Sequence, residues 1–77
     1  MDEATLFHRC RKALGLSFSA MARALLIAGP RNLQRWEDGT RPVSGRAWVA
    51  LEGVLRGKGE TALADRVIEV IEQRRQR

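Results

Sequence analysis

The chain has 77 residues, a formal net charge of +5 and a hydrophobic content of 44%. This length supports one domain with one modest core, and the hydrophobic content excludes wholesale disorder. No apolar run approaches the roughly 18 residues that a transmembrane helix needs. The first residues are acidic before they are apolar, the reverse of a signal peptide, and the single Cys10 favours a reducing compartment. We therefore expect a cytoplasmic protein with no membrane partner.

The composition is rich in Ala, Leu, Arg and Glu and contains no Tyr, which favours an all-α fold. We expect a compact bundle of about five short helices. The first is predicted from about residue 2 or 4 to Leu14, with Gly15 ending it. Its inward face consists of Leu6, Phe7, Cys10, Ala13 and Leu14, and its opposite face of His8, Arg11 and Lys12. The second helix is predicted over residues 18–26, with Ser17 as its N-cap. Its apolar side consists of Phe18, Met21, Ala22 and Leu25.

The stretch GPRNLQRWEDGTRP, residues 29–42, predicts a short third helix that begins at Pro30 and stops at Gly39. At about 100° per residue, Leu33 and Trp36 share one side of this helix. The other side consists of Arg31, Gln34, Arg35 and Asp38. An ordinary surface helix presents Glu and Lys to solvent, whereas arginine and amide side chains are suited to reading base edges.

Two further helices are predicted in the C-terminal half. The fourth follows Ser44, its N-cap, and extends to about Leu55, where the sequence RGKG ends it. Its inward residues are Ala47, Trp48, Leu51, Val54 and Leu55. The fifth spans about residues 60–75, with a core stripe of Leu63, Val67, Val70 and Ile71.

The C-terminal half carries more apolar surface than one core face requires. Ala64 and Ile68 widen the stripe of the fifth helix, and Val49 lies away from the apolar side of the fourth. This surplus predicts a homodimer in which Val49 and Ile68 contact the second copy.

The run LGLSFSAMARALLIAGPRNLQRWEDGTRPVSGRAWVALEGVL resembles the lambda-repressor-like (Cro-type) helix-turn-helix family. The family pattern is LS, an apolar-Ala pair, a turn, a polar helix ending in RWE-x-G and a basic loop. The matching positions are Leu16-Ser17, Met21-Ala22, Ala28-Gly29 and the RWEDG of residues 35–39, and the match covers about residues 4–57. Two positions differ from the pattern. Phe18 replaces the usual glutamine after LS, and Gly29-Pro30 replaces the usual Ser or Thr cap in a turn that is one residue longer.

The resemblance and the polar face of the third helix together imply a DNA-binding regulator. The expected partner is double-stranded DNA with an inverted-repeat operator, and the expected action is repression or autorepression. Base contacts are expected from Arg31, Asn32, Gln34 and Arg35, because guanidinium and amide groups pair with guanine and adenine edges. Phosphate contacts are expected from Ser17, Ser19, Arg23, Arg41, Ser44 and Arg46. In the competing interpretation this face is merely solvated, Arg35 pairs with Glu37 or Asp38, and Ser44 only caps its helix.

Other functions have less support in the sequence. Trp36 and Trp48 lie on apolar helix sides, which favours core packing over stacking on single strands. His8 and Cys10 are too few for a metal site, and no nucleophile–base pair exists, so we expect no metal, no cofactor and no catalysis. The alternative function is an antitoxin-type module that binds a protein partner, such as a toxin, through the fifth helix. A helix-turn-helix that had lost DNA binding would instead carry acidic or apolar residues in place of arginine and glutamine.

Overall fold

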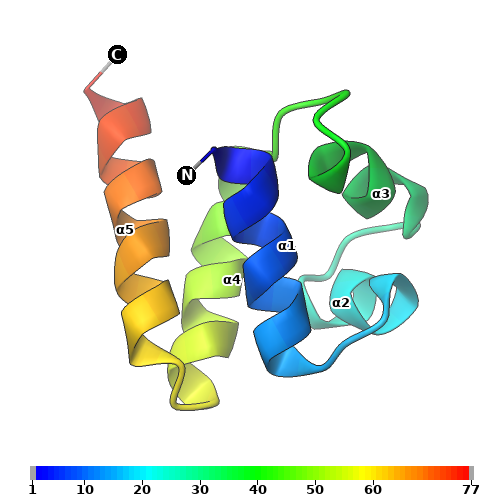
Figure 1. Ribbon diagram of the computed structural model, residues 1–77, viewed down its shortest axis with the longest axis horizontal. Helices are drawn as coiled ribbons and strands as arrows, with labels where there is room; N and C mark the ends of the chain where they lie inside the picture. Colours follow the sequence, from blue (N-terminus) through cyan, green and yellow to red (C-terminus); the bar gives the residue numbers. More distant parts are fainter. Residues whose placement is uncertain (1, 77) are drawn as a thin grey trace. The chain divides into compact units, whose positions relative to one another are not determined.

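The computed structural model describes residues 2–76, and within this range it contains helices and no strand, which confirms the all-α fold class. The helices are α1 (Glu3–Leu14), α2 (Phe18–Ala24), α3 (Arg31–Glu37), α4 (Gly45–Gly57) and α5 (Thr61–Arg75) (Figure 1). The chain divides into two compact units, one ending at Val43 with α1, α2 and α3, and one beginning at Ser44 with α4 and α5. None of the helices in the described range is long and apolar enough to span a bilayer.

Helix α1 is capped at both ends. Asp2 Oδ1 accepts a hydrogen bond from the Thr5 N–H at 2.7 Å, which satisfies one of the free donors of the first turn. Gly15 has φ 69°, a left-handed conformation that ends the helix as predicted, and its N–H donates to the Lys12 carbonyl. The inward face is narrower than expected, because Ala13 is exposed and Leu14 is only half-buried.

Helix α2 begins as predicted and ends early. The Ser17 Oγ accepts a hydrogen bond from the Ala20 N–H at 3.1 Å, which confirms Ser17 as the N-cap. The helix ends at Ala24 rather than at Leu26. The prediction was wrong because Leu26 adopts φ 58°, which no right-handed helix accommodates. Leu25, at the C-cap, is buried.

Helix α3 packs on both α1 and α2 through one apolar side. Leu33 and Trp36 are buried, as predicted. The Trp36 ring meets the Phe7 ring of α1 edge to face, with a centroid distance of 5.5 Å and an interplanar angle of 85°. Pro30 precedes the helix instead of forming its first turn, and its carbonyl accepts a hydrogen bond from the Gln34 N–H.

The second unit is a pair of antiparallel helices, α4 and α5 (Figure 1). The Ser44 Oγ accepts a hydrogen bond from the Ala47 N–H at 3.2 Å, which confirms Ser44 as the N-cap of α4. Helix α4 continues to Gly57, past its predicted end at Leu55, because the chain reverses only at Gly59, where φ is 80°.

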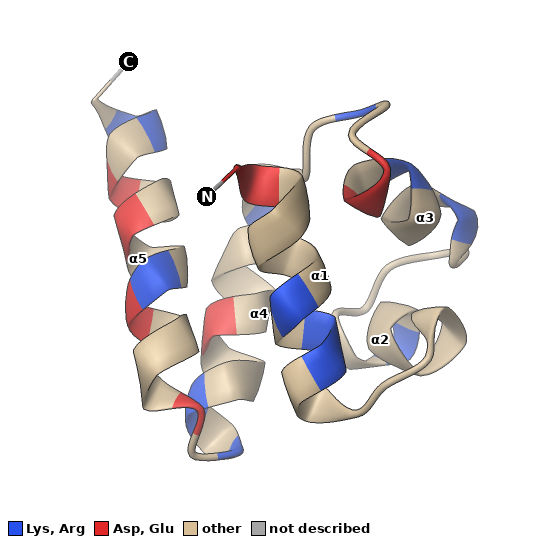
Figure 2. Ribbon diagram, in the orientation of Figure 1, with Lys and Arg blue, Asp and Glu red and all other residues tan. Residues whose placement is uncertain are grey.

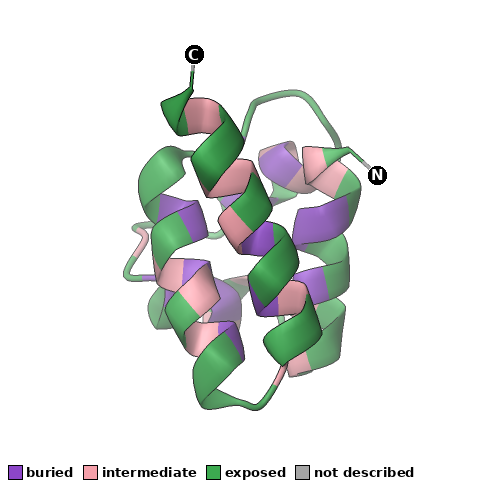
Figure 3. Ribbon diagram, turned by 90° about the vertical axis from the view of Figure 1, so that its left-hand side faces the viewer, coloured by how far each residue is buried: buried purple, intermediate pink, exposed green. Residues whose placement is uncertain are grey.

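The buried face of this unit differs from the predicted one on α5. Ala47, Trp48, Leu51 and Leu55 are buried on α4, while Val54 is half-buried. On α5 the buried residues are Ala64 and Val67, and Leu63, Ile68, Val70 and Ile71 are half-buried. Ala64 therefore belongs to the core and does not widen it. Figure 3 shows few buried segments on α5 beside many exposed ones. Helix α5 consequently presents half-buried apolar side chains outside its core contact.

Candidate nucleic-acid interface

An ion pair between α1 and α3 binds the glutamate at the end of α3. Arg11 Nε lies 2.6 Å from Glu37 Oε2, and Arg11 Nη2 lies 3.1 Å from Glu37 Oε1. Both side chains are nearly buried, with 13% of Arg11 and 8% of Glu37 exposed. His8 Nδ1 also lies 2.6 Å from Glu37 Oε1. Glu37 is therefore directed toward α1, and its charge is compensated there.

Arg11 also joins the first turn of α2 to this ion pair. Its Nη1 donates to the Leu16 carbonyl at 3.0 Å, and its guanidinium carbon lies 4.1 Å from the centroid of the Phe18 ring. A guanidinium above an aromatic face is a cation–π contact. Phe18, the residue that departs from the family pattern, thus supports the arginine that holds α3. We call Arg11, Phe18 and Glu37 the clamp.

The outer side of α3 carries the residues predicted to contact bases. Arg31, Asn32 and Gln34 are exposed, and Arg35 is half-buried. Within the described residues, Arg31 takes part in no ion pair. In the competing interpretation, Arg35 pairs with Glu37. The ion pairs of the described residues do not include this pair, because Glu37 is bound by Arg11 and His8.

Asp38, the C-cap residue of α3, is engaged by the turn that follows it. Its Oδ1 accepts hydrogen bonds from the hydroxyl and the backbone N–H of Thr40. These bonds, with a smaller contribution from the charge of Arg35, hold the pKa of Asp38 below its ordinary value. Figure 2 shows the resulting charge order along α3, with basic positions at its start and middle and acidic positions at its end.

The predicted phosphate-contacting residues of the first unit differ in how free their side chains are to bind a phosphate. Ser19 and Arg23 are exposed on α2, whereas the Ser17 hydroxyl already caps that helix. Arg41 is exposed, but it lines a hollow of about 460 Å³ together with Asp2 and other residues of the α1 N-terminus. The carboxylates of Asp2 and Glu3, which line the same hollow, would repel a phosphate there.

Ser44 and Arg46 belong to the second unit, at the start of α4. Both residues are exposed, although the Ser44 hydroxyl accepts the Ala47 N–H. Arg46 lies in the first turn of α4, where free backbone N–H groups also favour anions.

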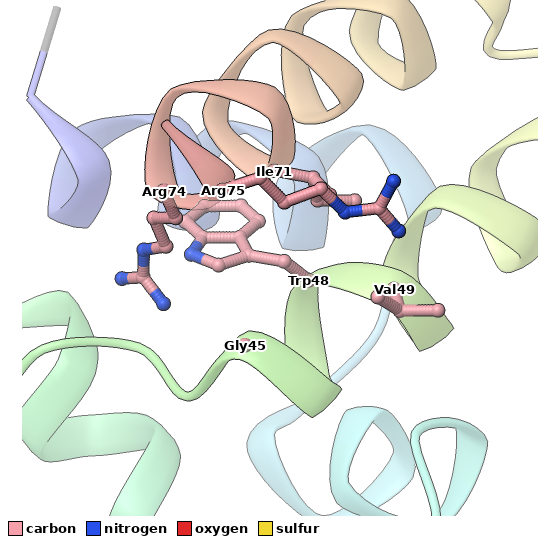
Figure 4. Close-up of a pocket in the computed structure, with 6 residues that line it drawn as sticks. All are labelled: Gly45, Trp48, Val49, Ile71, Arg74 and Arg75. Atoms are coloured by element: carbon pink, nitrogen blue, oxygen red, sulfur yellow. The ribbon is translucent and has the colours of Figure 1, made fainter. Parts of the chain in front are cut away.

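The predicted dimerisation residues lie in different environments. Val49 is 57% exposed and lines a hollow of about 240 Å³ over the Trp48 indole, whereas Ile68 is half-buried and does not line it. The other residues that line this hollow are Gly45, Ile71, Arg74 and Arg75. Figure 4 shows the two arginine side chains extending to opposite sides of the indole.

Sequence reasoning missed several residues of this interface. It placed His8 and Arg11 on a solvent face, although both bind Glu37. It also missed Ile71 and Arg75 as part of the surface beside Val49. Arg11 and Glu37 are too far apart in the chain for helical periodicity to connect them.

Comparisons of the chain with protein-family models, with curated proteins and with solved structures find no match. Among residues 2–76, no group of three or more His, Cys, Asp or Glu side chains is placed to hold a metal ion.

Proposed function

We propose that the protein is a sequence-specific regulator that binds double-stranded DNA through the outer side of α3, as the helix-turn-helix resemblance implies. The observation that carries this proposal is the separation of charge on α3. The acidic side chain of Glu37 is directed toward α1 by Arg11, while Arg31 and Gln34 are exposed. The outer side of α3 therefore offers arginine and amide groups to a polyanion, while Arg11 binds the glutamate at the C-terminal end of the helix.

The chemistry of these side chains supports base reading in the major groove. A guanidinium donates two parallel hydrogen bonds to guanine O6 and N7, and an amide pairs with adenine N6 and N7. Arg31 and Arg35 supply the first pattern, and Asn32 and Gln34 supply the second. The net charge of +5 adds sequence-independent attraction to phosphates. Repression by occupation of a promoter in the cytoplasm is the simplest use of such a protein.

We expect Arg35→Ala to weaken binding to the operator by about 1–3 kcal/mol, because one bidentate base contact is lost. The preference at one base position should relax in the same variant. Arg46→Ala, a phosphate contact in this proposal, should instead weaken binding to all sequences equally and reduce the salt dependence. The operator is first selected from a random DNA pool. Each variant is then titrated with operator and scrambled duplexes at two salt concentrations.

Two outcomes would contradict parts of this proposal. Equal losses on both duplexes for Arg35→Ala would reject Arg35 as a base-reading residue. A parent protein that enriches no sequence from the random pool would reject sequence-specific binding altogether. In that second case, the antitoxin-type module with a protein partner becomes the better proposal.

We further propose that the protein binds DNA as a homodimer. Helix α3 has seven residues and reaches only a few base pairs, too few to select one site among the ~10⁶ or more competing sites of a genome. Two copies on half-sites about one helical turn apart supply the missing specificity. Val49 is exposed on α4, and the half-buried Ile68 and Ile71 lie on α5 of the same unit. These side chains are the candidate contact with the second copy.

Val49→Asp and Ile68→Asp should each abolish dimerisation without loss of helicity, because a carboxylate in an apolar contact is costly to desolvate. The mass in solution, measured by light scattering, and the far-ultraviolet circular dichroism of each variant test this expectation. Glu69→Gln, at an exposed position of α5, is the control and should remain dimeric. A parent protein that is monomeric at high concentration and binds one asymmetric half-site would overturn the dimer proposal.

A further inference from the structure

Leu26 is unusual in both its backbone and its side chain. Its φ is 58°, and it is the one non-glycine residue with positive φ among the described residues. The other residues with positive φ are Gly15, Gly29, Gly39 and Gly59. Its side chain is 91% exposed, the largest exposed fraction of the large hydrophobic residues in the described part of the chain.

The left-handed backbone of Leu26 serves the fold, because it allows the hydrogen bonds to the Arg23 and Ala22 carbonyls that end α2. The leucine side chain does not, because it is almost fully exposed. The left-handed conformation brings the Cβ of an L-residue close to its own backbone, a strain that glycine avoids and asparagine tolerates better. Glycine or asparagine could form the same backbone hydrogen bonds with less strain, and this leucine buries almost nothing in return. A leucine in a left-handed position, with a side chain that buries almost nothing, points to a role for that side chain outside the fold.

The backbone around Leu26 is held in place on both sides. The Leu26 N–H donates to the Arg23 carbonyl at 3.1 Å, and the Ile27 N–H donates to the Ala22 carbonyl at 2.8 Å. Leu25, the residue before Leu26, is buried and anchors the chain there. The side chain of Leu26 therefore projects from a fixed position in the connection between α2 and α3.

The charges around this position indicate what Leu26 meets. Arg23 precedes it on the last turn of α2, and Arg31 follows it at the start of α3, and both are exposed. An apolar side chain with an exposed arginine on each side of it along the chain fits a surface that is anionic and carries isolated apolar groups. The major groove of DNA is such a surface, because the thymine C5-methyl group lies among polar base edges and between phosphate backbones.

We propose that Leu26 contacts a thymine methyl group in the major groove, next to the base pairs that α3 contacts. This inference rests on the proposed function. It adds an apolar contact from the connection between α2 and α3 to the polar base contacts of α3. It also explains why leucine occupies a position that glycine would occupy without strain.

Two substitutions separate the contact from the fold. Leu26→Gly and Leu26→Asn should have thermal midpoints equal to or above that of the parent, because both residues relieve the left-handed strain. Both should bind the operator about fivefold to tenfold more weakly, through loss of apolar burial. Their salt dependence should be unchanged, because no charge is removed. Leu26→Met keeps an apolar side chain of similar reach and is the matched control, with binding close to that of the parent.

Duplexes with uracil identify the contacted group. Each thymine of the operator is replaced in turn by deoxyuridine, which lacks only the C5-methyl group. At one position the replacement should weaken binding by the parent about as much as Leu26→Gly does, and it should not weaken the Leu26→Gly variant further. Normal operator binding by Leu26→Gly and Leu26→Asn, or the absence of such a coupled position, would overturn the proposal.

Arg35→Ala on the same duplexes separates this result from failure of the proposed function. If the parent selects no DNA sequence, the proposed function and the Leu26 contact are both rejected. If the parent and Arg35→Ala behave as expected while the Leu26 variants bind normally, only the Leu26 contact is rejected.

Discussion

Trp36→Ala should lower the free energy of unfolding by about 3–5 kcal/mol, because it empties a large site in the core of the first unit. The side chain is 7% exposed, and its ring packs against the edge of Phe7. In a chain of this size, such a loss lowers the thermal midpoint by roughly 12–40 °C. Under the proposed function, DNA binding should also be lost at temperatures where the variant is unfolded. Thermal melts followed by circular dichroism test this expectation.

Trp36→Phe is the control for this prediction, because it keeps an aromatic ring opposite Phe7. It should melt between the parent and Trp36→Ala and should bind DNA when folded. A Trp36→Ala variant that melts like the parent and still fails to bind would show that Trp36 contacts DNA and that its core role is wrong.

Arg11→Ala should destabilise the protein by about 3 kcal/mol, because it removes the guanidinium from the nearly buried Glu37 carboxylate and leaves only the contact with His8. It also removes the cation–π contact with Phe18 and the hydrogen bond to the Leu16 carbonyl. Urea unfolding of the parent and the variant measures this loss.

A double-substitution cycle tests whether the loss comes from the ion pair. Glu37→Ala in the Arg11→Ala background should cause little further loss, since the nearly buried carboxylate that lost its arginine partner is then gone. Additive losses in the double variant would show that the two residues act independently and would contradict the clamp.

Local signals in the sequence predict the helices and most of their ends. Ser17 and Ser44 cap α2 and α4, as expected of serine hydroxyls that accept backbone hydrogen bonds. Gly15 ends α1, as expected of a residue that adopts positive φ without strain. The apolar periodicity also identifies both buried tryptophans. These features depend on residues within a turn or two of each other, so they can be predicted from short stretches of the sequence.

The wrong predictions involve tertiary context. The run around Leu26 keeps a helical apolar pattern, and nothing local reveals that the chain leaves the helix at this leucine. The pairing of Glu37 with Arg11 joins residues from two helices, so spacing along one helix does not reveal it. Helical periodicity predicts which face of α3 is exposed. It does not predict that Glu37 is bound by Arg11 of another helix.

The clamp also affects how the protein could change during evolution. Leu33, Trp36 and Glu37 attach α3 to the first unit, whereas Arg31, Asn32 and Gln34 contribute little to that attachment because they are exposed. Exposed substitutions typically change stability by about 0.5 kcal/mol or less. Under the proposed function, new operator preferences are therefore accessible by single substitutions that leave the fold intact, and regulators of different genes could diverge from one stable scaffold.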